Sequence, residues 1–163
     1  MAQDKFQVRF GWGAAAVGRV GEDAHVLVWC DALPTGATVP EFEGATLLGT
    51  TGNAAATARW ILALQERLGG RAIVVVVAAG TDDGGFAVED FLAAGAVIDA
   101  LATIGIDFNS PEAASACAAF EGLRNAAAHL TSASETGQSI EPDLLAMAKA
   151  VSAEPGVQVL REG

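Results

Sequence analysis

Short apolar runs alternate along the chain with longer stretches in which apolar residues recur every three or four positions. The runs have the length and β-branched composition of strands, whereas the longer stretches have the period of a helix. One run contains Ile73 followed by four consecutive valines, so it is predicted to be buried on both faces, at the centre of a parallel or mixed sheet. The predicted strands cover residues 6–10, 24–30, 45–49, 72–77 and 157–160.

Capping and stop signals set the predicted helix ends. Asn53 is placed to cap a helix that begins at Ala54, and Gly69 is placed to end it. Further helices are predicted to begin near Val88, Pro111 and Pro142. Alternating strands and helices predict an α/β fold, with a mixed or mainly parallel sheet flanked by helices. Because there is no internal repeat or linker, residues 1–163 are predicted to form a single domain.

The charge balance limits the partners of the protein. Nine Lys and Arg residues against 20 Asp and Glu residues give a net charge of −11, which repels polyanions. We therefore expect neither nucleic acid nor an anionic membrane as a partner. A small anionic metabolite is compatible with this charge, because a single site can be locally positive or can use the charge of a metal ion. The 52% hydrophobic composition indicates a folded chain rather than a disordered one.

Other features concern the cellular compartment and the assembly. Cys30 and Cys117 each lie in an apolar run, which is typical of buried free thiols in a reducing cytoplasm. The first ten residues lack the pattern of a signal peptide, and no apolar run reaches the length of a membrane span. These features predict a cytoplasmic protein. The alanine-rich helix faces are typical of tight helix contacts, either within the chain or across a homodimer.

Residues 11–16, "GWGAAA", follow a predicted strand and fit the G-x-G-x-x-A form of the dinucleotide fingerprint, with Asp31 at the end of the next strand. The segment between the two strands is short and carries Gly18 and Gly21 where a crossover helix would run. We therefore predict a β-turn or hairpin here, and a nicotinamide enzyme only as a minor alternative.

Acidic and hydroxyl side chains follow three of the predicted strands. The loop "GTDDGG" at residues 80–85 leads from the valine-rich strand to a helix whose first turn carries Glu89 and Asp90. Acidic residues in a first turn also complement the helix dipole, so the pair has a structural explanation as well. However, ligands of open α/β sheets bind at this edge, and Mg²⁺ takes oxygen ligands from one or two carboxylates. The segment "GTTGN" at residues 49–53 joins a strand to a helix, and it can either cap the helix or bind a phosphate group. Asp31 lies at the end of a third strand, where the same two interpretations stay open.

The order of these motifs resembles the 2-phosphosulfolactate phosphatase family. The segment "AAGTDDGGFAVEDFLAAGAVIDAL" at residues 78–101 is similar to the signature region of that family. Three weaker similarities accompany it, at residues 25–38, 47–58 and 136–163. The family is magnesium-dependent, acts in coenzyme M biosynthesis and removes phosphate from a sulfonated 2-phospho acid. The resemblance thus implies a phosphosulfolactate-phosphatase-like α/β fold and a Mg²⁺-dependent phosphatase acting on a small anionic metabolite.

The resemblance also implies roles for individual residues. Asp31, Glu89 and Asp90 match positions expected to hold Mg²⁺ and to take part in catalysis. The positions expected to bind substrate are Thr50, Thr51, Asn53, Gly80 and Thr81.

Several positions depart from the family pattern. Pro34 replaces an arginine suited to phosphate binding, and Ala78 and Ala93 replace two cysteines. The chain is also shorter between Val39 and Ala45. Arg19, Arg59 and Arg71 are the candidates to replace the missing cation. The alternative is a catalytically inactive family member that binds a small ligand or oligomerises.

Overall fold

The computed structural model describes residues 2–33 and 36–163, so Pro34 lies outside the described residues. Within that part of the chain, five strands form one sheet in the order β1-β4-β2-β3-β5. The first four strands are parallel, and β5 pairs antiparallel with β3. The strands are β1 (Val8–Trp12), β2 (Val26–Cys30), β3 (Ala45–Leu48), β4 (Val74–Ala78) and β5 (Gln158–Arg161). The predicted α/β fold with a mainly parallel sheet is confirmed.

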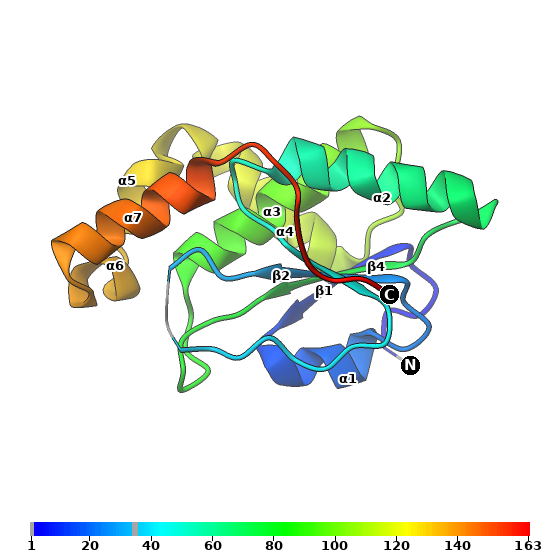
Figure 1. Ribbon diagram of the computed structural model, residues 1–163, viewed down its shortest axis with the longest axis horizontal. Coiled ribbons are helices and arrows are strands. Elements are labelled where there is room, and N and C mark those ends of the chain that lie inside the picture. The colour runs from blue at the N-terminus through cyan, green and yellow to red at the C-terminus, as the bar shows by residue number, and fades with distance from the viewer. Residues whose placement is uncertain (1, 34–35) are drawn as a thin grey trace.

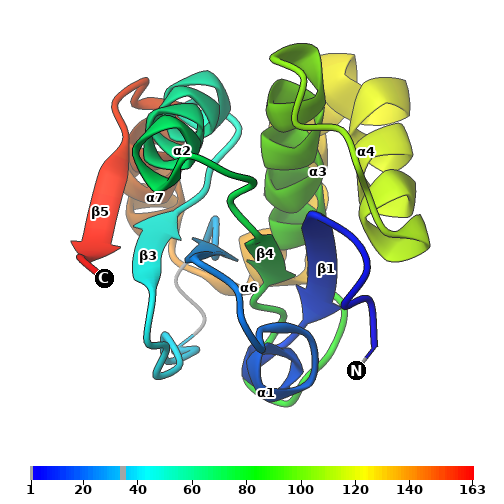
Figure 2. The same cartoon turned by 90° about the vertical axis from the view of Figure 1, so that its right-hand side faces the viewer.

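Helices cover the two faces of the sheet unequally. Helices α2, α3 and α4 lie on one face and α1 on the other, as Figures 1 and 2 show. Figure 1 also shows α5, α6 and α7 gathered beyond one end of the sheet. The helices are α1 (Val17–Val20), α2 (Ala54–Leu68), α3 (Val88–Thr103), α4 (Pro111–Leu123), α5 (Ala127–Ala133), α6 (Glu135–Ser139) and α7 (Pro142–Ala153), with 3₁₀ turns at Ala14–Ala16 and Arg124–Ala126.

The valine-rich strand β4 occupies the centre of the sheet, as its sequence predicts. Its side chains alternate between the faces. Val74 and Val76 pack in the core beneath α2, α3 and α4, whereas Val75 and Val77 pack in the smaller core on the side of α1. Both faces of β4 are therefore buried, and neighbouring strands pair with both of its edges.

Helices α3 and α4 approach each other closely. A Cβ atom on Gly95 of α3 would collide with the carbonyl oxygen of Ala116 on α4, so only glycine fits at this crossing. Ser110 caps α4, since its Oγ accepts a hydrogen bond from the N–H of Ala113. The predicted tight contact between alanine-rich helices is therefore made within the chain, and the homodimer stays a prediction.

The hairpin predicted between the first two strands is wrong. Strands β1 and β2 are not neighbours, because both pair in parallel with β4, which lies between them. The connection contains one 3₁₀ turn and the single-turn helix α1. A parallel crossover needs about a dozen residues, and residues 13–25 supply that length. Gly18 lies within α1 and Gly21 follows it. Both glycines are tolerated because α1 is only one turn long.

All four parallel strands end at the same edge of the sheet, which is the edge nearest to α5, α6 and α7 (Figure 1). The loops after β2, β3 and β4 therefore meet the C-terminal helices there. Among the described residues, no helix combines the length and the apolar character needed to cross a membrane.

Candidate active site

Asp90 joins two of the strand-end loops. It lies in the first turn of α3 and is completely buried. Its Oδ1 accepts a hydrogen bond from the N–H of Ala32 after β2 (2.8 Å), and its Oδ2 accepts one from the N–H of Gly80 after β4 (2.9 Å). Burial raises the pKa of Asp90 to about 8, with smaller contributions from the charges of Asp31 and Glu89, although the two N–H bonds oppose the shift.

Glu89 and Asp31 place carboxylate oxygens beside Asp90 without hydrogen-bond partners. Glu89 is only 1% exposed, and neither of its oxygens accepts a hydrogen bond; the buried Oδ1 of Asp31 is also unpartnered. Burial raises the pKa of Asp31 to about 6, and the charges of Glu89 and Asp82 add to the shift. Buried polar atoms are normally hydrogen-bonded, and a buried unpaired charge is strongly destabilising. A bound cation would satisfy these three oxygens.

The donor set fits a hard divalent cation. It consists of oxygen atoms alone, and Mg²⁺ is usually held by one or two carboxylates while water and phosphate fill its other positions. The oxygens of Asp31, Glu89 and Asp90 do not all lie within 4.8 Å of one another. Atoms that bind one Mg²⁺ ion directly at about 2.1 Å lie at most about 4.2 Å apart, so at most two of these three carboxylates can bind the same ion directly.

Another group of potential ligand atoms does lie within 4.8 Å among the described residues. It consists of Asp99 on α3 with Cys117 and Glu121 on α4. Its side chains are half-buried or exposed, and Arg124 lies 4.0 Å from Asp99. A thiol is a poor ligand for Mg²⁺, so this group does not match the cation that suits Glu89 and its neighbours.

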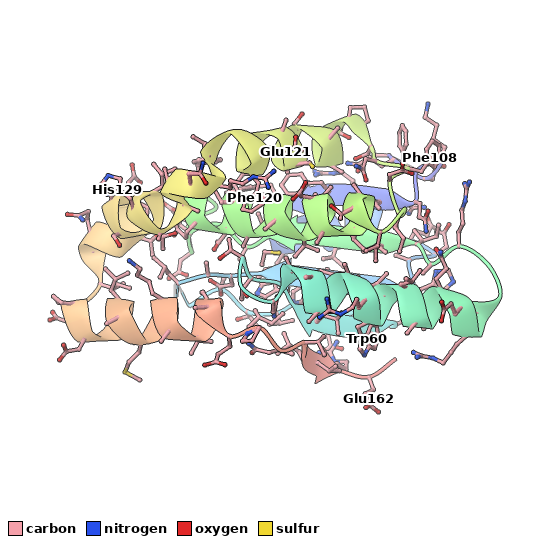
Figure 3. The ribbon with its side chains drawn as sticks, turned by 90° about the horizontal axis from the view of Figure 1, so that it is seen from above. Trp60, Phe108, Phe120, Glu121, His129 and Glu162 are labelled. Atoms are coloured by element: carbon pink, nitrogen blue, oxygen red, sulfur yellow. The ribbon has the colours of Figure 1, made fainter. Side chains whose placement is uncertain are left out.

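A cavity of about 140 Å³ opens beside Glu89. We call it the carboxylate cavity; its polar lining residues are Thr51, Glu89, Thr131, Lys149 and Ser152. These residues come from the loop after β3 and from helices α3, α5 and α7. Figure 3 shows α7 running beside α5 and ending near the segment that leads into α2. The cavity therefore lies where the sheet edge meets the C-terminal helices.

Two hydrogen bonds attach α7 to the strand-end loops. The Oγ of Ser152 donates to the carbonyl oxygen of Ala32 (3.2 Å), and the N–H of Gly52 donates to the carbonyl oxygen of Ser152 (3.0 Å). A Cβ atom on Gly52 would lie 2.5 Å from that same carbonyl oxygen. The glycine in "GTTGN" thus allows α7 to approach the loop after β3.

The predicted substrate-binding residues after β3 divide between two tasks. Thr51 is exposed and lines the carboxylate cavity, whereas Thr50 and Asn53 are buried. The N–H of Thr50 donates to Oδ1 of Asn53, and the N–H of Asn53 donates to Oγ1 of Thr50. Asn53 precedes α2 as predicted, but its side chain does not cap the helix and instead also bonds Thr57 and Leu48. The polar groups of Thr50 and Asn53 therefore hold the loop in shape.

Gly80 and Thr81 begin a tight turn after β4. Gly80 has a φ of 75°, and its N–H contacts Asp90. The hydroxyl of Thr81 donates to Asp83 within the turn. Thr81 lines a separate hollow of about 530 Å³ on the α1 side of the sheet, together with Trp29. Of the two residues, only Gly80 reaches the carboxylate group.

Sequence reasoning missed the wall of the cavity formed by α5 and α7. Lys149 stands alone as a charged residue within the apolar segment "LLAMAKAV", and that isolation was a usable signal. The three arginines proposed to replace the family cation do not line the cavity. Arg71 lies over the ring of Phe108, Arg19 lines a hollow near the N-terminus, and Arg59 is on an exposed position of α2.

Comparison with known proteins identifies a family. A family model described as 2-phosphosulpholactate phosphatase matches residues 38–149, which is more than half of the chain. The matched range contains Glu89, Asp90 and Lys149, whereas Asp31 precedes it. No curated protein matches the chain.

Proposed function

The chain belongs to the 2-phosphosulfolactate phosphatase family, and on this premise we propose that it is a Mg²⁺-dependent phosphatase. Its substrate would be the phosphate ester of a small anionic metabolite, either 2-phosphosulfolactate or a similar phospho acid. The observation that carries the proposal is the set of three buried carboxylate oxygens without partners, on Asp31 and Glu89, at the carboxyl edge of the sheet.

Each carboxylate has its own part in this proposal. Glu89 and Asp31 would hold the Mg²⁺ ion, because their free oxygens need a cation. Asp90 would position them, because it fixes Ala32 and Gly80 on either side of the site. When bound, Mg²⁺ would neutralise charge on the phosphate and assist the attack of water on it. The backbone near Gly80 and the side chain of Thr51 would border the ester.

The cavity limits the size of the substrate. Pockets that enclose a drug-sized ligand have volumes of about 300–1,000 Å³, whereas the carboxylate cavity measures about 140 Å³. A phospho acid with a few carbon atoms fits this space better than a nucleotide does. The cavity size therefore supports a small metabolite as the substrate.

The test is phosphate release from 2-phosphosulfolactate and a panel of phospho acids, in Mg²⁺ and in EDTA. Wild type is compared with Glu89→Gln and with Glu66→Gln, a matched change at an exposed position of α2. We expect turnover that requires Mg²⁺, falls at least about 100-fold in Glu89→Gln, and is unchanged in Glu66→Gln. Absence of turnover by a folded protein that still binds Mg²⁺ would instead indicate a non-catalytic, ligand-binding family member.

A further inference from the structure

Lys149 is the one basic side chain that lines the carboxylate cavity, and the described residues include every Lys and Arg of the chain. The other cations have different surroundings. Arg9 is buried and donates to backbone carbonyls such as those of Val20 and Glu22. Arg67 and Arg124 lie over aromatic rings. In a chain with a net charge of −11, a single lysine that lines the same cavity as Glu89 needs an explanation.

The ammonium group of Lys149 is held in place by α5. Its Nζ donates to Oγ of Ser132 (2.7 Å) and to the carbonyl oxygen of Ala128 (3.4 Å). An ammonium group has three N–H donors, so one remains for a ligand. Within the described part of the chain, no carboxylate lies within the 4.0 Å of Nζ that an ion pair requires. The positive charge of Lys149 is thus positioned but not neutralised.

Two residues of opposite charge line the cavity. Glu89 on α3 contributes a buried carboxylate with both oxygens free, and Lys149 on α7 contributes an ammonium group. Hydroxyl groups of Thr131 and Ser152 lie in the same lining. A ligand that pairs with both residues would carry a bound cation at one end, for Glu89, and a negatively charged group at the other end, for Lys149. A phospho acid with Mg²⁺ on its phosphate has this form.

Resting on the proposed function, we propose that Lys149 binds the acid group that stays on the substrate, its carboxylate or sulfonate, and so selects phospho acids over phosphate esters that lack a second acid group. The phosphate would lie on the side of Glu89 and the metal, whereas the acid group would accept a hydrogen bond from Nζ. The family arginine suited to binding an anion is replaced by Pro34 in this chain. Lys149, on α7, would bind an anion in its place. It is a specificity residue and takes no part in the transfer of protons or phosphate.

The variants separate the charge of Lys149 from its contact with α5. Lys149→Met removes the charge and keeps the apolar stem, whereas Lys149→Arg keeps the charge. Ser132→Ala removes the stronger contact with α5 and leaves the lysine. Lys5→Met is the matched control, because Lys5 is the other lysine of the chain and is exposed near the N-terminus.

The first measurement is the KM and kcat of each variant for 2-phosphosulfolactate and for isopropyl phosphate, a small phosphate ester that carries no second acid group. A charged hydrogen bond supports an increase in KM of about 10- to 100-fold for the phospho acid in Lys149→Met. We expect kcat to change less than about three-fold, and the kinetics of the ester without a second acid group to be unaffected. Lys149→Arg should recover most of the loss, Ser132→Ala should raise KM by less than Lys149→Met does, and Lys5→Met should resemble wild type.

The second measurement does not depend on turnover. Binding of the dephosphorylated acid, 3-sulfolactate, is followed by titration calorimetry in EDTA and in Mg²⁺. Binding by wild type that is lost in Lys149→Met supports the inference even if no phosphatase activity is found. The inference is overturned if Lys149→Met weakens both substrates equally, since Lys149 would then bind phosphate. It is also overturned if Ser132→Ala matches Lys149→Met, or if neither variant has an effect, because Lys149 would then only connect two helices.

Discussion

Replacing Glu89 with glutamine should make the metal-free protein more stable. The carboxylate of Glu89 is 1% exposed, has no hydrogen-bond partner and lies near Asp31 and Asp90, whose pKa values its charge raises. Glutamine has nearly the same shape and no charge. The substitution therefore removes a buried, unpaired charge and its repulsion of two neighbours, while the packing of α3 is kept.

The size of the effect follows from the burial of the group. An unsatisfied buried polar group costs about 1–3 kcal/mol, and a charged one costs more. The amide of glutamine stays unsatisfied, so we expect a net gain of about 1–3 kcal/mol from the loss of charge. For a chain of this length that corresponds to an increase in Tm of roughly 3–10 °C. Wild type should gain about 2.7 kcal/mol from Mg²⁺ at 100 times its Kd, whereas Glu89→Gln should gain almost nothing.

The assay is thermal unfolding of wild type, Glu89→Gln and the control Glu66→Gln at pH 7.5, each in EDTA and in a series of Mg²⁺ concentrations. Glu66 is exposed on α2, so its variant should match wild type in both conditions. A Glu89→Gln protein that is less stable than wild type in EDTA would show that the carboxylate makes favourable contacts. A variant that keeps the full response to Mg²⁺ would show that the cation binds elsewhere.

Three further predictions concern the same region. Because burial raises the pKa of Asp31 to about 6 and that of Asp90 to about 8, the folded state holds these protons more tightly than the unfolded chain. In EDTA, the stability that these two groups contribute should therefore be fully present below pH 4 and should be lost as the pH rises towards 8. The stabilisation by Mg²⁺ should grow over the same pH range. Urea unfolding at several pH values, in EDTA and in Mg²⁺, measures both trends. Asp90→Asn should lower the free energy of unfolding by about 1–3 kcal/mol, because the NH₂ of asparagine would face one of the two backbone N–H groups that now donate to Asp90. This effect is opposite in sign to that of Glu89→Gln, and denaturant melts of the two variants compare them. Gly52→Ala should lower the free energy of unfolding by about 1–3 kcal/mol through overpacking, because its Cβ would lie 2.5 Å from the carbonyl oxygen of Ser152. The same change should weaken Mg²⁺-dependent turnover. Gly18→Ala, which has open space around it, should leave stability unchanged in the same denaturant melts.

The framework of the fold could be predicted from local patterns. Four valines in a row require burial on both faces, and β4 is indeed paired on both edges and packed on both faces. Gly69 ends α2 in the left-handed conformation, and Ser110 caps α4. Each of these signals acts within a few residues, so sequence alone is sufficient to locate it.

The site could be predicted only in part. The family motif and the strand ends pointed to Asp31, Glu89 and Asp90, which the structure brings together after β2 and at the start of α3. The same motif could not predict that the side chains of Thr50 and Asn53 accept hydrogen bonds from each other's backbone N–H groups within the loop. It also could not distinguish the two faces of the sheet, so Thr81 was grouped with residues on the opposite face.

Long-range contacts account for what was missed. The crossover between β1 and β2 was mistaken for a hairpin, because the strand that separates them, β4, comes later in the sequence. The role of Lys149 depends on where α7 packs, and no local pattern specifies that position. Its isolation in an apolar helix marks it as unusual, but only the fold places it in the same cavity lining as Glu89.

The hydrogen bond between Ser152 and Ala32 spans 120 residues of sequence, and this separation has a consequence for biosynthesis. The carboxylates of α3 emerge from the ribosome well before α7 does. Helix α7 lines the cavity beside Glu89, so this wall of the site is completed only once α7 has been made and has docked against the loops that follow the strands.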